Sequence, residues 1–294
     1  WSVNVRSVQV GICGLGTVGS GVYNVISRNS DCINDRANCD IIIQQVGARR
    51  DNPNCNTSDV DVVRDIFEVA KNPEIDIVVE LIGGTTVAYD LVMTAIKNGK
   101  HVVTANKALI AEHGMEIFAF AADQGLEVAY EAAVAGGIPI IKGLREGLSA
   151  NKVNWVAGII NGTTNFILTE MDTKGRDFND VLVEAQEKGY AEADPTFDVE
   201  GIDAAHKLVI LASIAFEMPL TLEGLYTDGI TQLEPQDVAY AKELGYAIKH
   251  LGIARQTEQG VELRVHPTLV PHKSMIAGVN DVANAVMVNA DAVG

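Results

Sequence analysis

Short apolar runs alternate with amphipathic stretches over the first half of the chain. Five runs have the length of buried strands, at residues 8–13, 41–46, 75–82, 101–105 and 126–130. Apolar positions at helical spacing lie between them, for example over residues 89–98 and 108–124. This alternation is typical of a parallel sheet covered by helices. We therefore predict an α/β fold with a Rossmann-type, doubly wound parallel sheet.

The alternation loosens past Pro139, and this change predicts a second domain. Helices are expected from the polar turn at 161–165 to residue 171, at 178–188, from residue 202 onward and around 238–247. Strands are expected at 154–160, 261–265 and 284–289. These elements predict an α+β domain with antiparallel strands and helices on one face. We place a dinucleotide-binding domain at residues 1–138 and a substrate-binding, catalytic domain at residues 139–294.

A glycine-rich turn follows the first predicted strand directly and opens a helical pattern. It consists of Gly14, Leu15, Gly16, Thr17, Val18 and Gly19. In such a turn Gly14 permits the tight bend, Gly16 lets the backbone approach a pyrophosphate, and Gly19 allows close helix–strand packing. The helix N-terminus then offers free N–H groups to the phosphates. A purely structural glycine turn is the alternative, and the strand and helix on either side disfavour it.

Two arginines follow the second predicted strand. Arg49 and Arg50 come before Asp51, whereas an NAD site places a carboxylate here for the ribose 2′-hydroxyl. The arginines favour a 2′-phosphate and therefore NADP, while Asp51 leaves NAD open. The alternative is that each arginine is only a solvated loop charge.

The next two strand ends also carry candidate cofactor residues. Gly83 follows the run at 75–82, and small residues there leave room for the nicotinamide ribose at the switch point of an open sheet. Lys107 follows the run at 101–105, so the parallel sheet brings it to the same edge. A lysine in that place is more often a partner of phosphates or of a helix end than a catalyst.

The stretch from residue 185 to 207 concentrates acids between two helical patterns. It contains Glu187, Glu192, Asp194, Asp198 and Asp203. Asp203 and Lys207 are four residues apart and therefore share one helix face. A carboxylate beside an ammonium group can handle protons, and a solvated helix face is the alternative.

The segment from Glu131 to Pro139 combines one carboxylate with glycine-rich backbone. A carboxylate and several carbonyl oxygens suit a hard cation. The sequence alone also allows a hinge between the two domains.

Composition narrows the class of protein. Of 294 residues 47% are hydrophobic and 21% charged, as in a folded globular protein. The formal charge of −17 disfavours nucleic acid or an anionic membrane as a partner. The sequence has no apolar run of membrane-spanning length and no signal-peptide pattern. The four cysteines lack zinc-site spacing, so we expect reduced thiols in a cytoplasmic enzyme, with a disulfide among Cys32, Cys39 and Cys55 left open.

The acidic stretch resembles the signature of homoserine dehydrogenases. The matching positions are Ala185, Gly189-Tyr190-Ala191, Asp194-Pro195, Asp198-Val199, Gly201, Asp203 and Lys207. The glycine turn, the Thr-Ala-Asn-Lys run ending at Lys107 and the segment from Glu131 to Pro139 resemble the same family in the same order. The resemblance implies NAD(P)-dependent interconversion of L-homoserine and L-aspartate 4-semialdehyde, in the biosynthesis of threonine, methionine and isoleucine.

The resemblance also implies roles for individual residues. Lys207 is expected to transfer the proton, Glu192 to receive the substrate ammonium, and Asp198 and Asp203 to hold the rest of the substrate. Lys107 is expected near both cofactor and substrate. A sodium or potassium ion is expected at Glu131 and the carbonyls of Val134, Gly136 and Ile138. A homodimer is expected through the second domain.

Members of this family usually continue with a glycine-rich segment and a helix that returns to the cofactor domain, and many add an ACT domain. Neither follows Gly294, so we expect a C-terminally truncated, monofunctional type. Two other functions remain open. One is another Rossmann dehydrogenase of amino-acid aldehydes, and the other is an NADP-binding sensor without catalysis.

Overall fold

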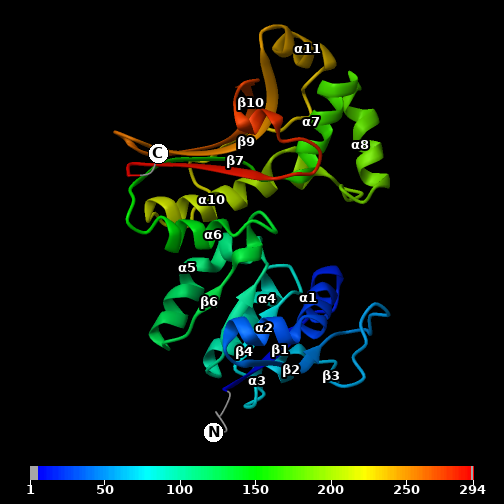
Figure 1. Ribbon diagram of the computed structural model, residues 1–294, viewed down its shortest axis with the longest axis vertical. Coiled ribbons are helices and arrows are strands. Elements are labelled where there is room, and N and C mark those ends of the chain that lie inside the picture. The colour runs from blue at the N-terminus through cyan, green and yellow to red at the C-terminus, as the bar shows by residue number, and fades with distance from the viewer. Residues whose placement is uncertain (1–5, 293) are drawn as a thin grey trace. The chain divides into compact units, whose positions relative to one another are not determined.

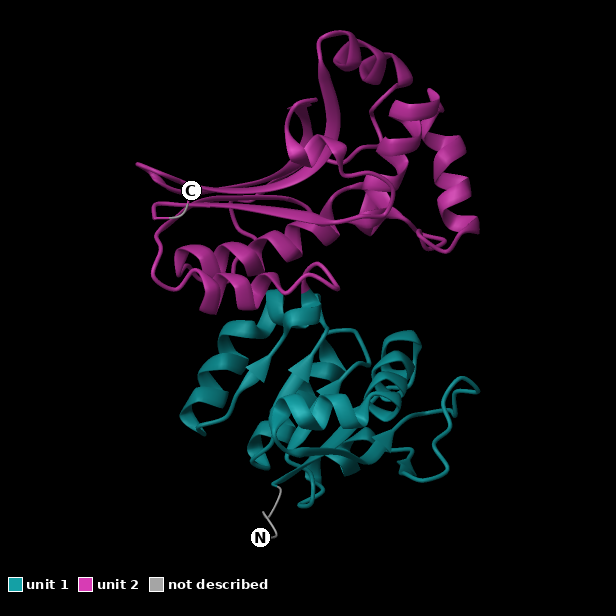
Figure 2. Cartoon of the chain, in the orientation of Figure 1, with its two compact units in different colours: residues 1–133 teal, residues 134–294 magenta. Residues whose placement is uncertain are grey.

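The computed structural model describes residues 6–292 and residue 294. The chain forms two compact units, Trp1–Ala133 and Val134–Gly294, which Figure 2 colours separately. The boundary that we placed after Ile138 lies a few residues further along the chain than the division between these units.

The first unit contains a six-stranded parallel sheet (Figure 1). Its strand order is β3-β2-β1-β4-β5-β6, the order of a Rossmann fold. The strands are β1 (Ser7–Cys13), β2 (Asp40–Gly47), β3 (Asp61–Val63), β4 (Ile77–Glu80), β5 (His101–Thr104) and β6 (Val128–Ala129). The predicted Rossmann-type doubly wound sheet is therefore confirmed. The order reverses between β1 and β4, which places the switch point at their carboxyl ends.

Helices cover both faces of this sheet. The helices are α1 (Thr17–Arg28), α2 (Ser30–Ala37), α3 (Ile66–Lys71), α4 (Thr86–Lys97) and α5 (Lys107–Asp123). Side chains alternate along each strand, so Val78 packs with α3, α4 and α5, whereas Val79 packs with α1. Burying a side chain of this size stabilises the fold by roughly 1.5–3 kcal/mol. Burial on both faces explains why these strands are continuous apolar runs in the sequence.

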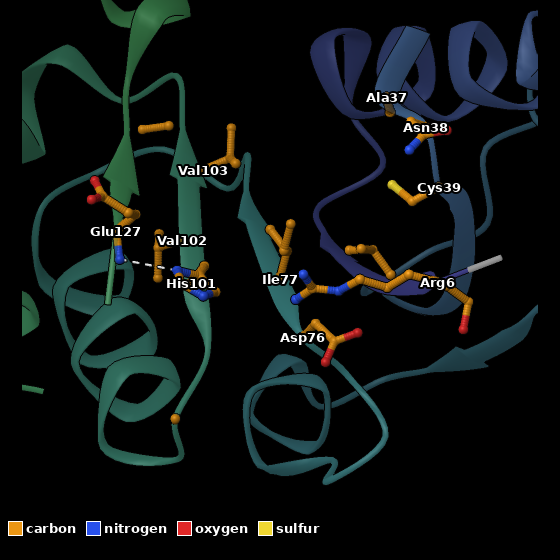
Figure 3. Close-up of a pocket in the computed structure, with 14 residues that line it drawn as sticks. Arg6, Ala37, Asn38, Cys39, Asp76, Ile77, His101, Val102, Val103 and Glu127 are labelled. Atoms are coloured by element: carbon orange, nitrogen blue, oxygen red, sulfur yellow. Dashed lines mark hydrogen bonds between the residues drawn. The ribbon is translucent and has the colours of Figure 1, made fainter. Parts of the chain in front are cut away.

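A groove of about 840 Å³ lies in the first unit, at the amino-terminal ends of the strands (Figure 3). Its lining includes Arg6, Asp76 and Val103, and the imidazole of His101 accepts a hydrogen bond from the Glu127 N–H at 3.0 Å. The glycine turn follows the opposite, carboxyl end of β1. This groove is therefore not the predicted cofactor edge.

The second unit is built on a five-stranded sheet with the order β11-β7-β9-β10-β8. The strands are β7 (Val153–Ile159), β8 (Tyr226–Thr227), β9 (Tyr246–Thr257), β10 (Gly260–Pro271) and β11 (Ala285–Ala290). All neighbours are antiparallel except β8 and β10, which are parallel. The predicted α+β architecture with antiparallel strands is therefore confirmed.

Helices of the second unit pack mainly around one face of this sheet (Figure 1). The longer helices are α7 (Gly162–Lys174), α8 (Phe178–Glu187), α10 (Ile202–Phe216) and α11 (Pro235–Glu243). Short turns complete the unit: α6 (Ile140–Lys142), the π-helical η2 (Gly143–Gly147), α9 (Thr196–Val199) and the 3₁₀ turn η3 (Met275–Gly278). A further 3₁₀ turn, η1 (Glu131–Ala133), belongs to the first unit.

The structure differs from the sequence prediction most clearly at β9, a long strand that the sequence did not predict. We expected a helix to continue to residue 247, but α11 ends at Glu243 and Gly245 adopts φ +85° before β9 begins. The strand is buried on both faces over most of its length, including the polar Lys249 and His250. Buried polar residues remove the alternation by which a half-exposed strand is recognised.

No helix within the described residues has the length and apolar character needed to cross a membrane.

All four cysteines are free thiols. Burial raises the pKa of the Cys13 thiol to about 12, and the nearby Glu80 carboxylate adds a smaller effect in the same direction. The disulfide that the sequence left open is not formed.

An ion-pair network joins α7 to α8 in the second unit. The buried carboxylate of Glu170 accepts hydrogen bonds from Lys174 at 2.7 and 2.9 Å and from Arg176 at 3.1 Å. Arg176 also pairs with Glu184 on α8. Hydrogen bonding from Lys174 lowers the pKa of Glu170, and burial opposes that shift.

We expect Glu170→Gln to lower the free energy of unfolding at pH 7 by about 2 kcal/mol, because charge-assisted hydrogen bonds are lost. A lowered folded-state pKa contributes stability above the unfolded-state value of about 4.3, and that contribution disappears as pH falls through the folded-state value. Denaturant unfolding should therefore show a gap between wild type and variant that closes below about pH 4. Glu243→Gln, at an exposed site on α11, is the control. A gap independent of pH would contradict the assignment.

Candidate active site

The glycine turn after β1 has the geometry that its sequence predicted. Gly14 adopts φ +104°, and a Cβ there would lie 2.6 Å from the Leu81 carbonyl oxygen. A Cβ on Gly19 would collide with the Gly14 carbonyl oxygen. A Cβ added to Gly16 would have no atom within 4 Å apart from its chain neighbours, so this position faces open space. Two glycines therefore serve packing, and the third leaves room for a ligand.

The first turn of α1 is free to bind an anion. Its N-cap is Gly16, which offers no side-chain hydrogen bond, and no acid lies in its first turn. Thr17 and Val18 are exposed, while Leu15 is buried and its carbonyl accepts a 2.7 Å hydrogen bond from Asn52. The first N–H groups of a helix have no partner within the helix, and the positive end of its dipole favours phosphate. The residues present therefore fit a dinucleotide pyrophosphate.

A third arginine joins the pair after β2. Arg49 and Arg50 are exposed, and Asp51 forms an ion pair with Arg64 at 2.8 Å. Arg64 also donates to the Ala48 carbonyl at 3.1 Å. Sequence reasoning missed Arg64, because it follows the three-residue strand β3, which is too short to recognise from its pattern. The parallel pairing of β2 and β3 brings their carboxyl ends together.

A buried carboxylate ties together the loops after β4 and β5. Glu80 is fully buried, and it accepts hydrogen bonds from the Gly83 N–H at 3.2 Å and from the Thr104 hydroxyl at 2.5 Å. The Asn106 N–H donates to Thr104, and the Asn106 amide donates to the Gly84 carbonyl at 2.7 Å. Gly83 is thereby held at φ +72°. Sequence reasoning missed Glu80, although a lone acid inside an apolar strand is a usable signal.

Lys107 is half-buried at the first position of α5, directly after the N-cap Asn106. The Asn106 side chain accepts a 3.1 Å hydrogen bond from the Leu109 N–H. A positive charge at a helix N-terminus opposes the helix dipole. Helix stability therefore does not explain this lysine.

In the second unit, Asp203 and Lys207 form a largely buried ion pair on α10. Their side chains are 4% and 16% exposed, and Lys207 Nζ lies 2.7 Å from Asp203 Oδ2. Lys207 Nζ also donates to the Ile160 carbonyl at 2.8 Å. The predicted spacing on one helix face is present, and burial rules out a merely solvated face.

Asn161 connects this pair to Asp198. Its side-chain nitrogen lies 2.8 Å from Asp198 Oδ1 and 2.8 Å from Asp203 Oδ2. Its side-chain oxygen accepts a hydrogen bond from the Thr164 N–H at 2.9 Å and so caps α7. The sequence left open which acid is closer to Lys207. Asp203 contacts Lys207 directly, and Asn161 bonds to both acids.

Glu192 and Asp194 of this stretch lie on its exposed loop. Glu192 is exposed, and its backbone carbonyl accepts a hydrogen bond from Gln186 at 3.0 Å. Asp194 accepts hydrogen bonds from the hydroxyl and the backbone N–H of Thr196. Both bonds lower the pKa of Asp194, and the hydroxyl bond has the larger effect. Asp194 therefore shapes the turn that leads into α9.

The segment predicted to hold a cation is a sequence of turns. Glu131 opens η1, Val134 is fully buried, and Gly137 adopts φ +86°. The carbonyl of Ile138 accepts a 2.8 Å hydrogen bond from Ile140 N–H. The described part of the chain contains no group of three or more His, Cys, Asp or Glu side chains that could hold a metal ion. Any cation in this segment would therefore depend on carbonyl oxygens beside Glu131.

A Rossmann sheet with an open glycine turn, followed by a unit with a buried lysine–carboxylate pair, defines a two-domain dehydrogenase that uses a nicotinamide dinucleotide. The family model described as "Homoserine dehydrogenase, NAD binding domain" matches residues 14–131, and the model described as "Homoserine dehydrogenase" matches residues 139–294. The chain belongs to the homoserine dehydrogenase family, whose enzymes are oxidoreductases acting on a CH–OH group.

Individual relatives agree with this membership. A homoserine dehydrogenase of Pseudomonas aeruginosa is 67% identical over 290 residues, which cover 99% of this chain and 67% of the relative. One of Bacillus subtilis is 41% identical and covers 99% of this chain and 67% of the relative. The crystal structure of a homoserine dehydrogenase from Thiobacillus denitrificans is 58% identical, with a TM-score of 0.95 over 99% of this chain and 68% of that one. The chain thus spans about two thirds of the length of these relatives.

A hyperthermophilic archaeal homoserine dehydrogenase in complex with NADPH shares the fold, with a TM-score of 0.82 at 23% identity. The aligned region covers 98% of this chain and 90% of the archaeal chain. At this identity the likeness concerns the fold alone.

We expect Gly16→Val to weaken NADPH binding on the order of a hundredfold, about 3 kcal/mol, because its side chain fills the open space above the turn. Thermal unfolding should change little, since no atom lies within 4 Å of a Cβ at Gly16. NADPH fluorescence titration measures the affinity. Gly19→Val is the comparison, and it should lower thermal stability because its Cβ meets backbone. Unchanged NADPH affinity in the Gly16 variant would exclude this turn as the pyrophosphate site.

Proposed function

We propose that this chain interconverts L-homoserine and L-aspartate 4-semialdehyde with NADP(H). The observation that supports this most is the buried pair of Lys207 and Asp203, in a chain whose first unit has an open dinucleotide turn. Residues 1–138 would bind the dinucleotide and residues 139–294 the substrate. The spans matched by the two family models, 14–131 and 139–294, support that division.

Each proposed role follows from the chemistry of its side chain. When bound, the nicotinamide supplies or accepts the hydride at the substrate carbon. Lys207 gives a proton to the aldehyde oxygen in reduction and removes it from the hydroxyl in oxidation. Asp203 orients the Lys207 ammonium through its 2.7 Å contact. Such a positioned proton donor contributes typically 10²–10⁴-fold to the rate.

The remaining acids would bind the amino-acid part of the substrate. Glu192 is exposed on its loop, where it could meet the substrate ammonium. Asp198 holds its place through Asn161 and would contact the polar groups near the reacting carbon. Lys107 would lie beside the cofactor and the substrate, since it stands at the edge of the sheet that the cofactor loops share.

The arginine cluster supports NADP over NAD. Asp51 is the acid that would accept the ribose 2′-hydroxyl of NAD, and it is paired with Arg64 instead. Arg49 and Arg50 remain exposed beside it. Guanidinium groups bind phosphate through paired N–H donors, so this edge favours a 2′-phosphate.

We also propose a sodium or potassium ion held by Glu131 and the carbonyls of Val134, Gly136 and Ile138. One carboxylate with several carbonyl oxygens is a donor set for a hard cation. If the ion binds there, thermal unfolding should occur at a higher temperature in NaCl or KCl than in choline chloride of equal ionic strength. Equal unfolding temperatures would exclude the ion.

A second copy of the chain is the proposed partner. Strand register places Ala157 beside Ile253 and Met287 on one sheet face, with Trp155 next along the same face. These four side chains are only half-buried, whereas Leu208 of α10 packs beneath Gly252 on the opposite face. Partly exposed apolar side chains on a sheet face suit a two-fold interface. Light scattering at the mass of one chain, at micromolar concentration, would contradict the dimer.

The proposed reaction implies a cytoplasmic role in the biosynthesis of threonine, methionine and isoleucine. The 67% identical relative is itself a homoserine dehydrogenase, and the four thiols are unpaired. Expression in a bacterial strain that lacks homoserine dehydrogenase should restore growth without added homoserine. Failure of an otherwise folded, expressed protein would count against this role.

We expect NADPH formation from L-homoserine at alkaline pH by wild type, and a loss on the order of a hundredfold or more in Lys207→Ala. NADPH affinity should be the same in both, because Lys207 belongs to the second unit. Lys242→Ala, on the exposed side of α11, is the matched control.

Unchanged turnover in Lys207→Ala would exclude its role. Turnover only by a version extended past Gly294 would show that further residues complete the site. Binding of NADPH without turnover of homoserine by either version would favour the sensor, and turnover of another amino-acid aldehyde would favour the related dehydrogenase.

We expect the double variant Arg49→Ser/Arg50→Ser to raise the KM for NADP at least about tenfold, which corresponds to about 1.4 kcal/mol of lost phosphate contact. The KM for NAD should change much less, since NAD has no 2′-phosphate. Arg28→Ser, at the exposed end of α1, is the control for loss of positive charge in the same unit. Equal changes for both cofactors would show that these arginines do not select the phosphate.

A further inference from the structure

Asn161 stands where the sheet of the second unit meets two of its helices. It follows β7 after Ile160, precedes the first residue of α7, and is only 4% exposed. Every polar atom of its side chain is engaged, the oxygen by the Thr164 N–H and the nitrogen by Asp198 and Asp203. A buried polar side chain with all its bonds formed has a defined orientation.

The two bonds from the side-chain nitrogen reach acids on different elements. Asp198 belongs to α9 and Asp203 to α10, on either side of Gly201 at φ +81°. A primary amide has two N–H donors, so one group serves both carboxylates. Asp203 Oδ2 also accepts from Lys207 Nζ at 2.7 Å. Asn161 and Lys207 thus hold the same oxygen from two directions.

Capping of α7 does not explain why the residue is asparagine. Capping uses only the side-chain oxygen, and Asp or Ser caps a helix about as well. Elsewhere in the chain, Asp65 caps α3 and Asp177 caps α8 with the same kind of bond. An Asp at position 161 would keep the cap and place a third carboxylate against two others. The N–H donors are therefore the feature that distinguishes Asn from the alternatives.

We propose that Asn161 is a positioning residue for proton transfer, and this inference rests on the proposed function. Its amide fixes the Asp203 carboxylate so that Oδ2 faces Lys207, and it holds Asp198 at a set separation from Asp203. It also places a neutral donor between two negative groups, which would otherwise repel each other. The Lys207 ammonium is thereby held in one orientation toward the substrate.

Two variants separate the cap from the donors. Asn161→Asp keeps a capping oxygen and replaces the N–H donors with negative charge, and Asn161→Ser keeps a cap without charge. Asp177→Ala is the matched control, because it removes the cap of α8 without touching the acids. For each protein we would measure kcat and KM with L-homoserine and NADP over a range of pH, together with the thermal unfolding temperature.

Both Asn161 variants should lower kcat on the order of tenfold or more, the effect of losing a hydrogen bond to a charged group. The KM for NADP should be unchanged. In Asn161→Asp the pH–rate profile should also move to higher pH, because added negative charge favours the protonated form of a neighbouring group. Asp177→Ala should lower the unfolding temperature and leave kcat and the pH profile as in wild type. Wild-type kcat and pH profile in both folded Asn161 variants would overturn the proposal.

Labelling of the Lys207 amine gives a second test that needs no turnover. The rate of its acetylation by acetic anhydride, followed by mass spectrometry, reports the pH at which the amine loses its proton. Asn161→Asp should move this labelling to higher pH, and Asp177→Ala should not. The labelling shift without homoserine turnover, by this chain or by the version extended past Gly294, would refute the proposed function and leave Asn161 with an effect on the Lys207 amine only. An active wild type without the shift would refute the positioning role alone.

Discussion

A buried carboxylate requires hydrogen-bond donors, and this constraint organises the second unit. Asp203 is nearly inaccessible to water, so its charge depends on Asn161 and Lys207. Those two donors come from the end of β7 and from α10 itself, and Lys207 also bonds to the Ile160 carbonyl. Charge-assisted hydrogen bonds therefore join the segment after β7 to α10. The same contacts that satisfy the carboxylate also fix the position of the Lys207 ammonium, so the stability of this region and the proposed chemistry depend on one set of bonds.

The first unit also has a buried carboxylate held by hydrogen-bond donors, at the carboxyl edge of its sheet. Glu80 is fully buried and is bonded to the Gly83 N–H and the Thr104 hydroxyl. Thr104 in turn accepts from Asn106, which caps the helix that begins with Lys107. The loops at this edge of the sheet are thus held in place partly by a core residue, Glu80. Loops fixed in this way lose little further entropy when a ligand binds.

Local chemistry made much of this protein predictable. The glycine turn could be assigned from the sequence because a positive φ at Gly14 and the close approach at Gly19 each exclude a side chain. The parallel strands could be assigned because burial on both faces leaves continuous apolar runs. The strand β9 could not, because it buries Lys249 and His250 inside the unit. Arg64 was missed because a three-residue strand has no pattern of its own.

By itself, the sequence determined the Rossmann class, the geometry of the glycine turn and the pairing of Asp203 with Lys207, because each depends on residues close together along the chain. Only the tertiary structure decided which distant groups meet these residues. Asn161 lies 42 positions from Asp203, and Arg64 lies 13 from Asp51. Gly201 adopts φ +81°, and a Cβ there would lie 3.1 Å from His250 and Val265 on two strands, so its surroundings as well as its backbone favour glycine. Such contacts depend on how strands and helices pack, and no local spacing encodes that packing.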